Sequence, residues 1–360
     1  MSGRVVVLGG SGFLGSRVCL AFAAAGCRVL SVSRSGARPP WWPDDIESAA
    51  IDLSTTDTGG LRRALAGADV VVNAVAAVWR TTEESMRALN AEFVDRLVDV
   101  LADLRPRPRL VHLGSCYEYG PAEFGAATTE DDQRPPTSSY GATKRQGTEA
   151  VQRAAREHRV DAVVLRVANM SGPGAHGDSL PGMVAGRLAS GAAQLLLTPL
   201  TSWRDYVDVR DVADSVLAAA TAEAVSGRVV NIGSGAAIPV RDLVHRLIAL
   251  SGVPARIVEL TDRTARESMP WQQLDVSRAR QLLGWRPARD LDDSLADMLA
   301  AEHRQKRERS ESSSWSGAAV SSAPEWSASG AEGQKTPHNR RLARERSEPM
   351  SRPERGGATL

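Results

Sequence analysis

The sequence lacks the features that mark secreted and membrane-embedded proteins. Its 360 residues include three cysteines, Cys19, Cys27 and Cys116. An odd, low number without the close spacing of a disulfide framework argues against a secreted scaffold and favours a reducing compartment. The apolar run at residues 5–8 is too short for a signal peptide or a membrane span, and glycines follow it at once. We therefore expect a soluble, cytoplasmic protein with no membrane partner.

The sequence also has no excess of positive or of negative side chains. Lys and Arg total 44 and Asp and Glu total 43, so the formal net charge is only +1. This balance gives no reason to expect nucleic acid as a partner. Hydrophobic residues make up 42% of the chain, which is enough for a sizeable core. From residue 304 aliphatic residues become sparse, and we expect residues 304–360 to form a disordered tail.

Strand-like and helix-like segments alternate along the first half of the chain. Short apolar runs predict strands at residues 5–8, 28–33, 49–53, 69–76, 110–113 and 162–167. Helical spacing and helix end signals predict helices at residues 16–25, 61–66, 83–104 and 138–158. This regular alternation predicts an α/β fold with a Rossmann-type, doubly wound parallel sheet, followed by a smaller C-terminal lobe.

A glycine-rich turn joins the first predicted strand to the first predicted helix. Gly9, Gly12 and Gly15 follow a G-x-x-G-x-x-G spacing. Glycines in this position let the backbone approach a pyrophosphate at a helix N-terminus, so the turn predicts dinucleotide binding; a plain tight turn is the alternative. The second strand ends in Arg34, where an NAD site usually has a carboxylate, and an arginine suits the 2′-phosphate of NADP. We expect NADP(H) as the cofactor. The alternative is NAD, in which case Arg34 would be a solvated loop residue.

Tyr140 and Lys144 are four residues apart in a predicted helix and lie one turn from each other on the same face. A free phenol has a pKa of about 10 and is a poor acid or base at neutral pH. A lysine ammonium beside it favours the phenolate and lowers that pKa. The alternative is a packing tyrosine with a solvated lysine. Ser115 follows one predicted strand and Asn73 lies in the last part of another, at the edge of the sheet where ligands bind.

Taken together, the motifs resemble the extended short-chain dehydrogenase/reductase family, the NAD-dependent epimerases and dehydratases that act on nucleotide-linked sugars. The resemblance covers about residues 5–299. The shared motifs are, in order, Gly9/Gly12/Gly15, Asp52-Leu53, Asn73-Ala74, Ser115 with Tyr119-Gly120, Tyr140 with Lys144, Leu165-Arg166 with Asn169 and Gly172-Pro173-Gly174, Arg204-Asp205-Tyr206-Val207 with Asp211-Val212, Asn231-Ile232-Gly233-Ser234-Gly235, and Leu283-Gly284-Trp285.

The resemblance implies roles for individual residues. Tyr140 would be the acid/base, Lys144 would hold the nicotinamide ribose and lower the tyrosine pKa, and Ser115 would bind the reacting sugar oxygen. The implied cofactor contacts are Gly9, Ser11, Gly12, Phe13, Leu14, Gly15, Arg34, Asp52, Leu53, Asn73, Ala74, Val75, Ala76, Asn90, Tyr140, Lys144 and Val167. The implied substrate contacts are Ser115, Cys116, Tyr117, Asn169 and Arg204. We expect no metal site, and the family implies a homodimer.

Departures from the family pattern narrow the expected reaction. Dehydratases of the family carry an Asp-Glu pair directly after the serine or threonine, and this chain has Cys116-Tyr117 there. Dehydration is therefore not expected, and we interpret Cys116 as a small packing residue, with a catalytic thiol as the alternative. Arg204 is expected to clamp a diphosphate, because its planar fork pairs with phosphate oxygens; an ion pair with Asp205 or Asp208 is the alternative.

The remaining motifs look most like those of 4-ketoreductases acting on nucleotide-linked 4-keto-6-deoxysugars. We therefore expect NADPH-dependent reduction of the C4 ketone of a dTDP- or GDP-linked 4-keto-6-deoxyhexose, with Tyr140 as proton donor. A nucleotide-sugar 4-epimerase with tightly bound NAD is the first alternative, and a non-catalytic dinucleotide-binding regulator is the second. Residues 1–168 would form the NADP(H)-binding domain with the catalytic residues, and residues 169–303 a substrate lobe with segments that return to the sheet.

Overall fold

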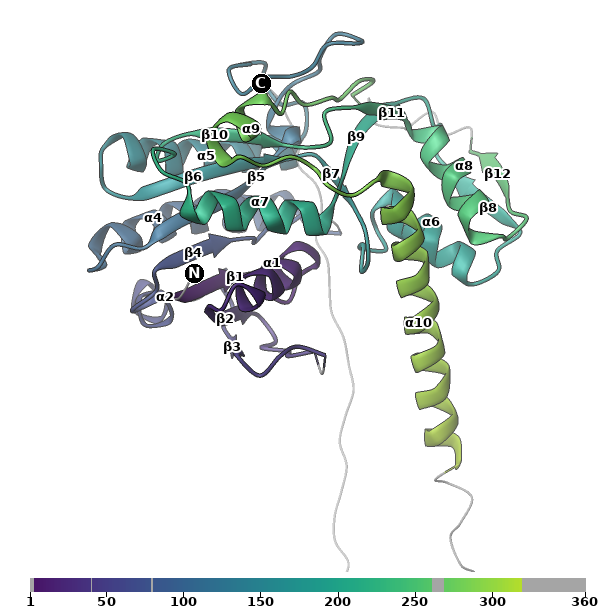
Figure 1. Ribbon diagram of the computed structural model, residues 1–360, viewed down its shortest axis with the longest axis horizontal. Helices are drawn as coiled ribbons and strands as arrows, with labels where there is room; N and C mark the ends of the chain where they lie inside the picture. Colours follow the sequence, from purple (N-terminus) through teal and green to yellow (C-terminus); the bar gives the residue numbers. More distant parts are fainter. Residues whose placement is uncertain (1–2, 40, 79, 261–268, 319–360) are drawn as a thin grey trace, which may run out of the picture. The chain divides into compact units, whose positions relative to one another are not determined.

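The computed structural model describes residues 3–39, 41–78, 80–260 and 269–318 (Figure 1). Residues Met1–Glu311 form one compact unit by their contacts, and Ser312–Leu360 form a second. The site and its surroundings lie within the first unit. In the described part of the chain, no helix is long and apolar enough to cross a membrane.

A seven-stranded sheet, with every pairing parallel, forms the centre of the first unit, which confirms the predicted Rossmann-type fold. Its spatial order is β10-β6-β5-β4-β1-β2-β3. The strands are β1 (Arg4–Leu8), β2 (Arg28–Ser33), β3 (Ile46–Ala50), β4 (Val70–Asn73), β5 (Arg109–Ser115), β6 (Asp161–Val167) and β10 (Val229–Ile232). The order reverses between β1 and β4, and such a reversal opens a crevice beyond the carboxyl ends of the strands.

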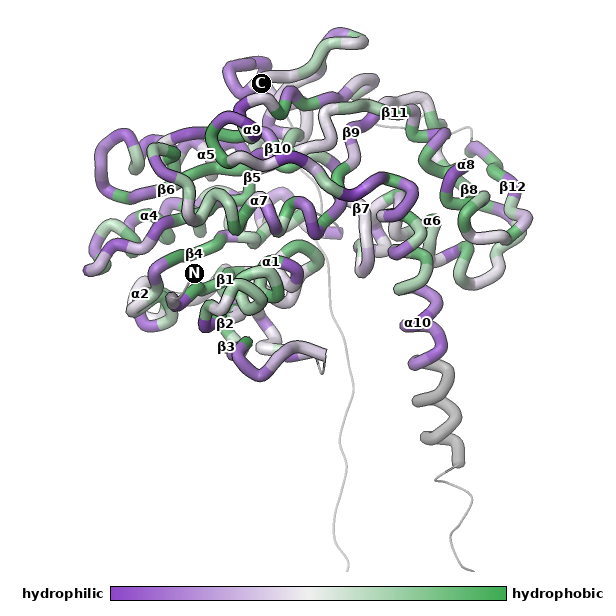
Figure 2. Tube along the Cα trace, in the orientation of Figure 1, coloured by the Kyte–Doolittle hydropathy of each residue, from purple (hydrophilic) through white to green (hydrophobic). Residues whose placement is uncertain are grey.

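Helices cover both faces of this sheet. On one face α1 (Phe13–Ala24) and α7 (Val209–Thr221) pack against Val5 and Val7 of β1. On the other face α2 (Thr58–Leu65), α4 (Phe93–Asp103) and α5 (Ser139–Arg156) pack against Val6 and Leu8. Figure 2 shows the hydrophobic character of β1 and β4. Because both faces are buried, these strands are continuously apolar rather than alternating.

The predicted helix at residues 83–104 is observed, with one difference. It consists of α3 (Glu83–Arg87), a π-helical turn (Ala88–Glu92) and α4 in direct succession. Single π-helical turns inside α-helices are rare and are often found at functional sites. Here the turn contains the buried Asn90.

Several predicted boundaries were wrong: the strand predicted at residues 69–76 ends at Asn73, and the helices predicted at 16–25 and 61–66 begin at Phe13 and Thr58. The third strand is β3 (Ile46–Ala50) rather than residues 49–53, because β2 offers partners only as far as Ser33, which pairs with Ala50. Helix α10 (Leu291–Ala318) continues past residue 304, where the disordered tail was expected to begin. Arg, Glu, Gln and Lys after Ala301 are good helix formers, so this segment extends the helix although it has little apolar surface. The remainder of the expected tail, residues 319–360, lies outside the described residues.

A further core forms among elements that follow β6. Helices α6 (Leu180–Ala189), α8 (Val240–Ser251) and the start of α10 enclose it, together with the parallel pair β8 (Gln194–Leu197) and β12 (Arg256–Glu259). A three-stranded sheet, β11 (Ala237–Pro239), β9 (Trp203–Asp208) and β7 (Asn169–Ser171), lies beside it. Helix α9 (Ser277–Leu283) contacts β10. Because β7 begins two residues after β6 ends, it lies just beyond the carboxyl edge of the main sheet.

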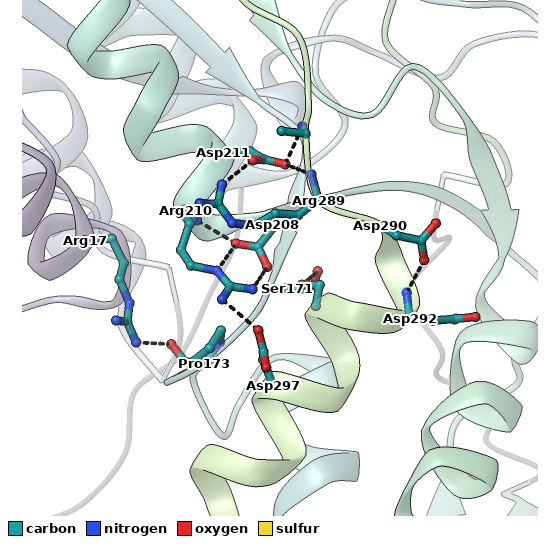
Figure 3. A network of polar contacts seen from close by, with 12 residues as sticks. Arg17, Ser171, Pro173, Asp208, Arg210, Asp211, Arg289, Asp290, Asp292 and Asp297 are labelled. Carbon is teal, nitrogen blue, oxygen red and sulfur yellow. Dashed lines mark hydrogen bonds and ion pairs between the residues drawn. The ribbon is translucent and has the colours of Figure 1, made fainter.

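A network of ion pairs joins α7 to α10 (Figure 3). Asp208 caps α7 by accepting a hydrogen bond from the Arg210 backbone, and its carboxylate lies 2.8 Å from the Arg210 guanidinium. Arg210 also reaches Asp297 of α10 at 2.7 Å. Arg17 of α1 donates to the Pro173 carbonyl oxygen at 2.9 Å. These contacts join α1 to the segment after β7, and α7 to α10.

Candidate active site

The glycine turn has the geometry of an anion cradle. Gly9 has a φ of 80°, and a Cβ on Gly15 would lie 2.1 Å from the Gly9 carbonyl oxygen, so both positions require glycine. Helix α1 begins at Phe13, and the N-cap residue Gly12 provides no side-chain hydrogen bond. The uncapped first turn of a helix attracts a phosphate group through its backbone N–H groups and dipole. The turn, with Ser11 and Leu14 around it, therefore fits the pyrophosphate of a dinucleotide.

The loop after β4 lies directly against this turn. A Cβ on Gly9 would be 3.0 Å from the Ala74 carbonyl oxygen. Asn73 is fully buried, accepts a hydrogen bond from the Val75 N–H at 3.2 Å, and its Nδ2 lies 3.1 Å from Nδ1 of His112. These contacts fix the path of residues 74–76 across the carboxyl edge of the sheet.

Asn90 connects the same loop to the tyrosine helix. From the π-helical turn, its Oδ1 accepts from the Ala77 N–H and its Nδ2 donates to the Ala77 carbonyl, both at 2.9 Å. Its Nδ2 also lies 3.2 Å from Oγ1 of Thr143 in α5. Asn90 therefore holds the predicted cofactor loop in place. Its side-chain oxygen and nitrogen are both hydrogen-bonded to other groups of the protein.

Arg34 lies exposed at the position that follows β2. Asp52 and Leu53 follow the adjacent strand β3, Leu53 being buried. The pKa of Asp52 is lowered by hydrogen bonds from Ser54 and, to a smaller extent, by the charge of Arg34, so the two side chains are near each other. Arg38, by contrast, is bound to Asp44 at 3.0 Å and to backbone carbonyls of its own loop. Arg34 therefore remains the candidate for the predicted contact with a ribose phosphate.

The structure brings Ser115, Tyr140 and Lys144 together at the end of β5. Ser115 is the last residue of that strand, and it pairs in register with the buried Val167 of β6. Its side chain lies beside Tyr140 and acts to lower the pKa of the Tyr140 phenol. Lys144 is 2% exposed, and its Nζ donates to the Leu113 carbonyl oxygen at 2.6 Å.

The predicted effect of Lys144 on Tyr140 was wrong in this structure. Burial raises the pKa of the Tyr140 phenol above its ordinary value, and the side chain of Ser115 is the influence that opposes this rise. Burial also lowers the pKa of the Lys144 ammonium to about 8. Residue spacing correctly placed the two side chains on one helix face, but burial, which spacing does not reveal, sets the direction of both pKa shifts.

Cys116 and Tyr117 follow Ser115 in a short 3-10 turn. Cys116 is 2% exposed in the main core, and burial raises the pKa of its thiol to about 12, so it remains a neutral packing residue. The Tyr117 ring meets the Tyr140 ring edge to face, with centroids 6.1 Å apart. Its hydroxyl donates to Oδ1 of Asn169 at 3.4 Å. Tyr117 thus links the catalytic tyrosine to the strand after β6.

Arg204 is 7% exposed in β9, and its Nη1 donates to the carbonyl oxygens of Trp203 and Met269 at 2.8 and 2.6 Å. Its charge lowers the pKa of the Tyr117 phenol, against the larger effect of burial, so the guanidinium lies near Tyr117. The alternative of an ion pair with Asp205 or Asp208 is not observed among the described residues: Asp205 accepts hydrogen bonds from Ser234 and Asp208 pairs with Arg210.

Gln272 is a polar residue of this site that the sequence did not reveal. It is 5% exposed, and its Oε1 accepts a hydrogen bond from Nδ2 of Asn169 at 2.5 Å. Within the described ranges, its Nε2 is buried without a hydrogen-bond partner. Gln272 is 103 residues from Asn169 along the chain, and no spacing signal connects them.

This fold and the groups along its carboxyl edge define a Rossmann-type enzyme that uses a dinucleotide. Residues 5–233 match the NAD dependent epimerase/dehydratase family, and the chain belongs to this family, the extended short-chain dehydrogenases/reductases. The predicted family is thereby confirmed.

Comparison with known proteins supports this assignment. The chain is 41% identical over 308 residues to the dTDP-6-deoxy-L-talose 4-dehydrogenase (NAD(P)(+)) of Kitasatospora kifunensis, which covers 83% of this chain and 95% of the relative. It is 28% identical over 333 residues to a UDP-glucose 4-epimerase of Azospirillum brasilense, covering 82% and 90%. The crystal structure of MoeE5 with UDP-glucuronic acid and NAD has the same fold, with a TM-score of 0.75 and 24% identity, covering 84% of this chain and all of that one.

Proposed function

We propose that this enzyme catalyses the NADPH-dependent reduction of the C4 ketone of a dTDP- or GDP-linked 4-keto-6-deoxyhexose. The observation that carries the proposal is the grouping of Tyr140, Lys144 and Ser115 at the end of β5, where the Lys144 Nζ donates to the Leu113 carbonyl oxygen at 2.6 Å. The name of the 41% identical relative is consistent with this reaction, because a 4-dehydrogenase and a 4-ketoreductase carry out the same redox step in opposite directions.

The cofactor would be held by the glycine turn, the loop at residues 73–76, Arg34, and the Tyr140 helix. When bound, it supplies the hydride for the ketone carbon. The protein supplies the proton: the raised pKa keeps Tyr140 protonated at neutral pH, so the phenol is ready to donate to the ketone oxygen. Ser115 orients that oxygen by a second hydrogen bond. Below pH 8 the Lys144 ammonium balances negative charge that develops on the phenol.

The substrate would lie between the catalytic group and the strands that follow β6. Tyr117 and Asn169 line this route through their mutual hydrogen bond. Arg204 would bind the diphosphate through the guanidinium nitrogens other than Nη1, because Nη1 donates to two backbone carbonyls. These contacts suit a nucleotide-linked sugar better than a free sugar.

The direct test follows NADPH absorbance on addition of a freshly prepared 4-keto-6-deoxyhexose linked to dTDP or to GDP. We expect oxidation of NADPH with one of the two and a 6-deoxyhexose as product. No oxidation with either substrate, using enzyme that still binds NADPH in a thermal-shift assay, would overturn the proposal.

A 4-epimerase is the second candidate, because a UDP-glucose 4-epimerase is also a relative over most of the chain. Such an enzyme would purify with bound NAD and interconvert two sugars without net redox change. Purification without cofactor and a requirement for added NADPH would exclude it. We also propose a cytoplasmic homodimer that forms through α4 and α5; light scattering of the purified protein would test the dimer.

A further inference from the structure

The side chain of Glu118 packs directly against the end of β5, where Ser115 lies. Its side chain is fully buried, and its Oε1 accepts a hydrogen bond from the Ser115 backbone N–H at 2.7 Å. The Ser115 hydroxyl in turn accepts from the Tyr117 N–H at 3.3 Å, which closes a reciprocal capping box. A Cβ atom at position 114 would lie 2.6 Å from the Glu118 Oε1. Because this residue is glycine, the strand leaves room for the carboxylate.

Arg166 holds the other oxygen of this carboxylate. It lies on β6 opposite Gly114, and its Nε is 2.7 Å from the Glu118 Oε2. The guanidinium carbon lies 4.4 Å from the centroid of the Tyr119 ring, and the Tyr119 hydroxyl donates to Asn231 of β10 at 2.8 Å. A buried carboxylate is costly unless it is paired and hydrogen-bonded, and Glu118 is both.

Glu118 also acts on the catalytic groups electrostatically. Its charge raises the pKa of Tyr140 and the pKa of Lys144, although burial is the larger influence on each. Among the described acidic residues, Glu118 is the one whose carboxylate bonds the backbone of a catalytic residue in the proposed mechanism.

We propose that Glu118 and Arg166 form a positioning pair that fixes Ser115 against Tyr140. The pair touches neither substrate nor cofactor; it acts through the strand end and the 3-10 turn. The inference rests on the proposed function only in treating Ser115 and Tyr140 as the catalytic pair, and it does not depend on which sugar nucleotide is reduced.

The first test needs no substrate. The chain has four tyrosines, so ring-carbon labelled tyrosine gives a simple NMR spectrum in which Tyr140→Phe identifies the Tyr140 signal. Glu118→Gln and Ser115→Ala should each shift this signal. In the Ser115→Ala background, Glu118→Gln should add a clearly smaller shift, because the part that passes through the serine is lost and only the direct effect of the Glu118 charge remains. Equal shifts with and without Ser115, or no shift at all, would overturn the proposal.

The second test uses the redox assay in the same double-mutant cycle. Glu118→Gln should lower kcat by about 10- to 100-fold with little change in the KM for NADPH, and the loss should be clearly smaller in the Ser115→Ala background. Glu130→Gln is the matched control: Glu130 is also buried and accepts from the Asn231 N–H, but it makes no contact with Ser115. A loss of the same size in the control would show a merely structural effect.

Glu118→Gln leaves Arg166 without its buried partner and can lower the yield of folded protein. The double variant Glu118→Gln/Arg166→Met removes both charges and keeps the NMR test possible. It should show the same shift of the Tyr140 signal. A double variant with the wild-type signal would overturn the pair's role. An enzyme that is inactive on every ketosugar but shows the predicted NMR coupling would refute the proposed function and leave the positioning pair standing.

Discussion

The Lys144 Nζ lies 2.6 Å from the carbonyl oxygen of Leu113, inside the sheet edge and 2% exposed. The carbonyl fixes the ammonium one helical turn from Tyr140, at the carboxyl end of β5. Since burial lowers the pKa of Lys144 to about 8, its charge state changes just above neutral pH. This contact therefore predicts how the enzyme responds to alkaline conditions.

Activity should fall as the pH rises through about 8, because Lys144 then loses the proton that its role requires. The measurement is the pH profile of kcat/KM for the sugar nucleotide, with the KM for NADPH followed in parallel. Lys144→Met should have low activity and no basic limb near pH 8. A wild-type profile that stays flat from pH 7 to 10 would contradict this assignment.

The same shift predicts a change in stability with the opposite sign. The folded-state pKa of about 8 lies below the ordinary lysine value of 10.5, so between these pH values the unfolded chain binds more protons. The free energy of unfolding should therefore gain ~2 kcal/mol from this residue between pH 8 and 10. Urea unfolding of wild type and Lys144→Met at both pH values measures the difference, with exposed Lys306→Met as control. The same pH dependence in wild type and Lys144→Met would refute it.

Tyr140→Phe should abolish most of the reductase activity, with a loss of about 10²- to 10⁴-fold in kcat, because the proton donor is removed. NADPH should still raise the melting temperature, since the glycine turn is untouched. The control is Tyr119→Phe, which loses a hydrogen bond to Asn231 and should cost about 1 kcal/mol of stability. Equal activity losses in both variants would mean that the phenol of Tyr140 has no special role.

Local signals predicted the fold and the central part of the site. Glycine spacing placed the anion cradle, and strand ends placed Asn73 and Ser115, because parallel strands bring their carboxyl ends to one edge. The spacing of Tyr140 and Lys144 gave their shared helix face.

Features that depend on tertiary packing could not be predicted in this way. Burial, rather than the neighbouring lysine, sets the pKa of Tyr140. Gln272 reaches Asn169 across 103 residues, and the Glu118–Arg166 pair joins the 3-10 turn after β5 to β6. The end of β3 is decided by the length of its partner strand, which its own sequence does not show.

Arg34 should determine the preference for NADPH over NADH. Arg34→Ala removes the cation expected to meet the 2′-phosphate, and a charge-assisted hydrogen bond of about 1.5–3 kcal/mol corresponds to a roughly 10- to 100-fold higher KM for NADPH. The KM for NADH should change little. The control is Arg63→Ala, an exposed arginine in α2. Parallel changes in both KM values would show that Arg34 does not contact the 2′-phosphate.

Gln272 should contribute to binding of the sugar nucleotide. Its Nε2 is buried without a partner among the described residues, and a buried donor of this kind costs about 1–3 kcal/mol until an acceptor meets it. A substrate oxygen at this position would provide the acceptor. Gln272→Leu should therefore raise the KM for the sugar nucleotide roughly 10-fold, with a smaller effect on kcat and none on the KM for NADPH.

The adjacent Gln273 provides the matched control for this prediction. Its Nε2 donates to the Gly235 carbonyl oxygen at 2.9 Å, so Gln273→Leu removes a satisfied structural hydrogen bond from the same type of side chain. That variant should lose stability and keep the wild-type KM for the sugar nucleotide. If Gln272→Leu keeps the wild-type KM as well, the unpaired amide does not face the substrate. If both variants raise the KM equally, the segment acts through its fold and not through the Gln272 donor.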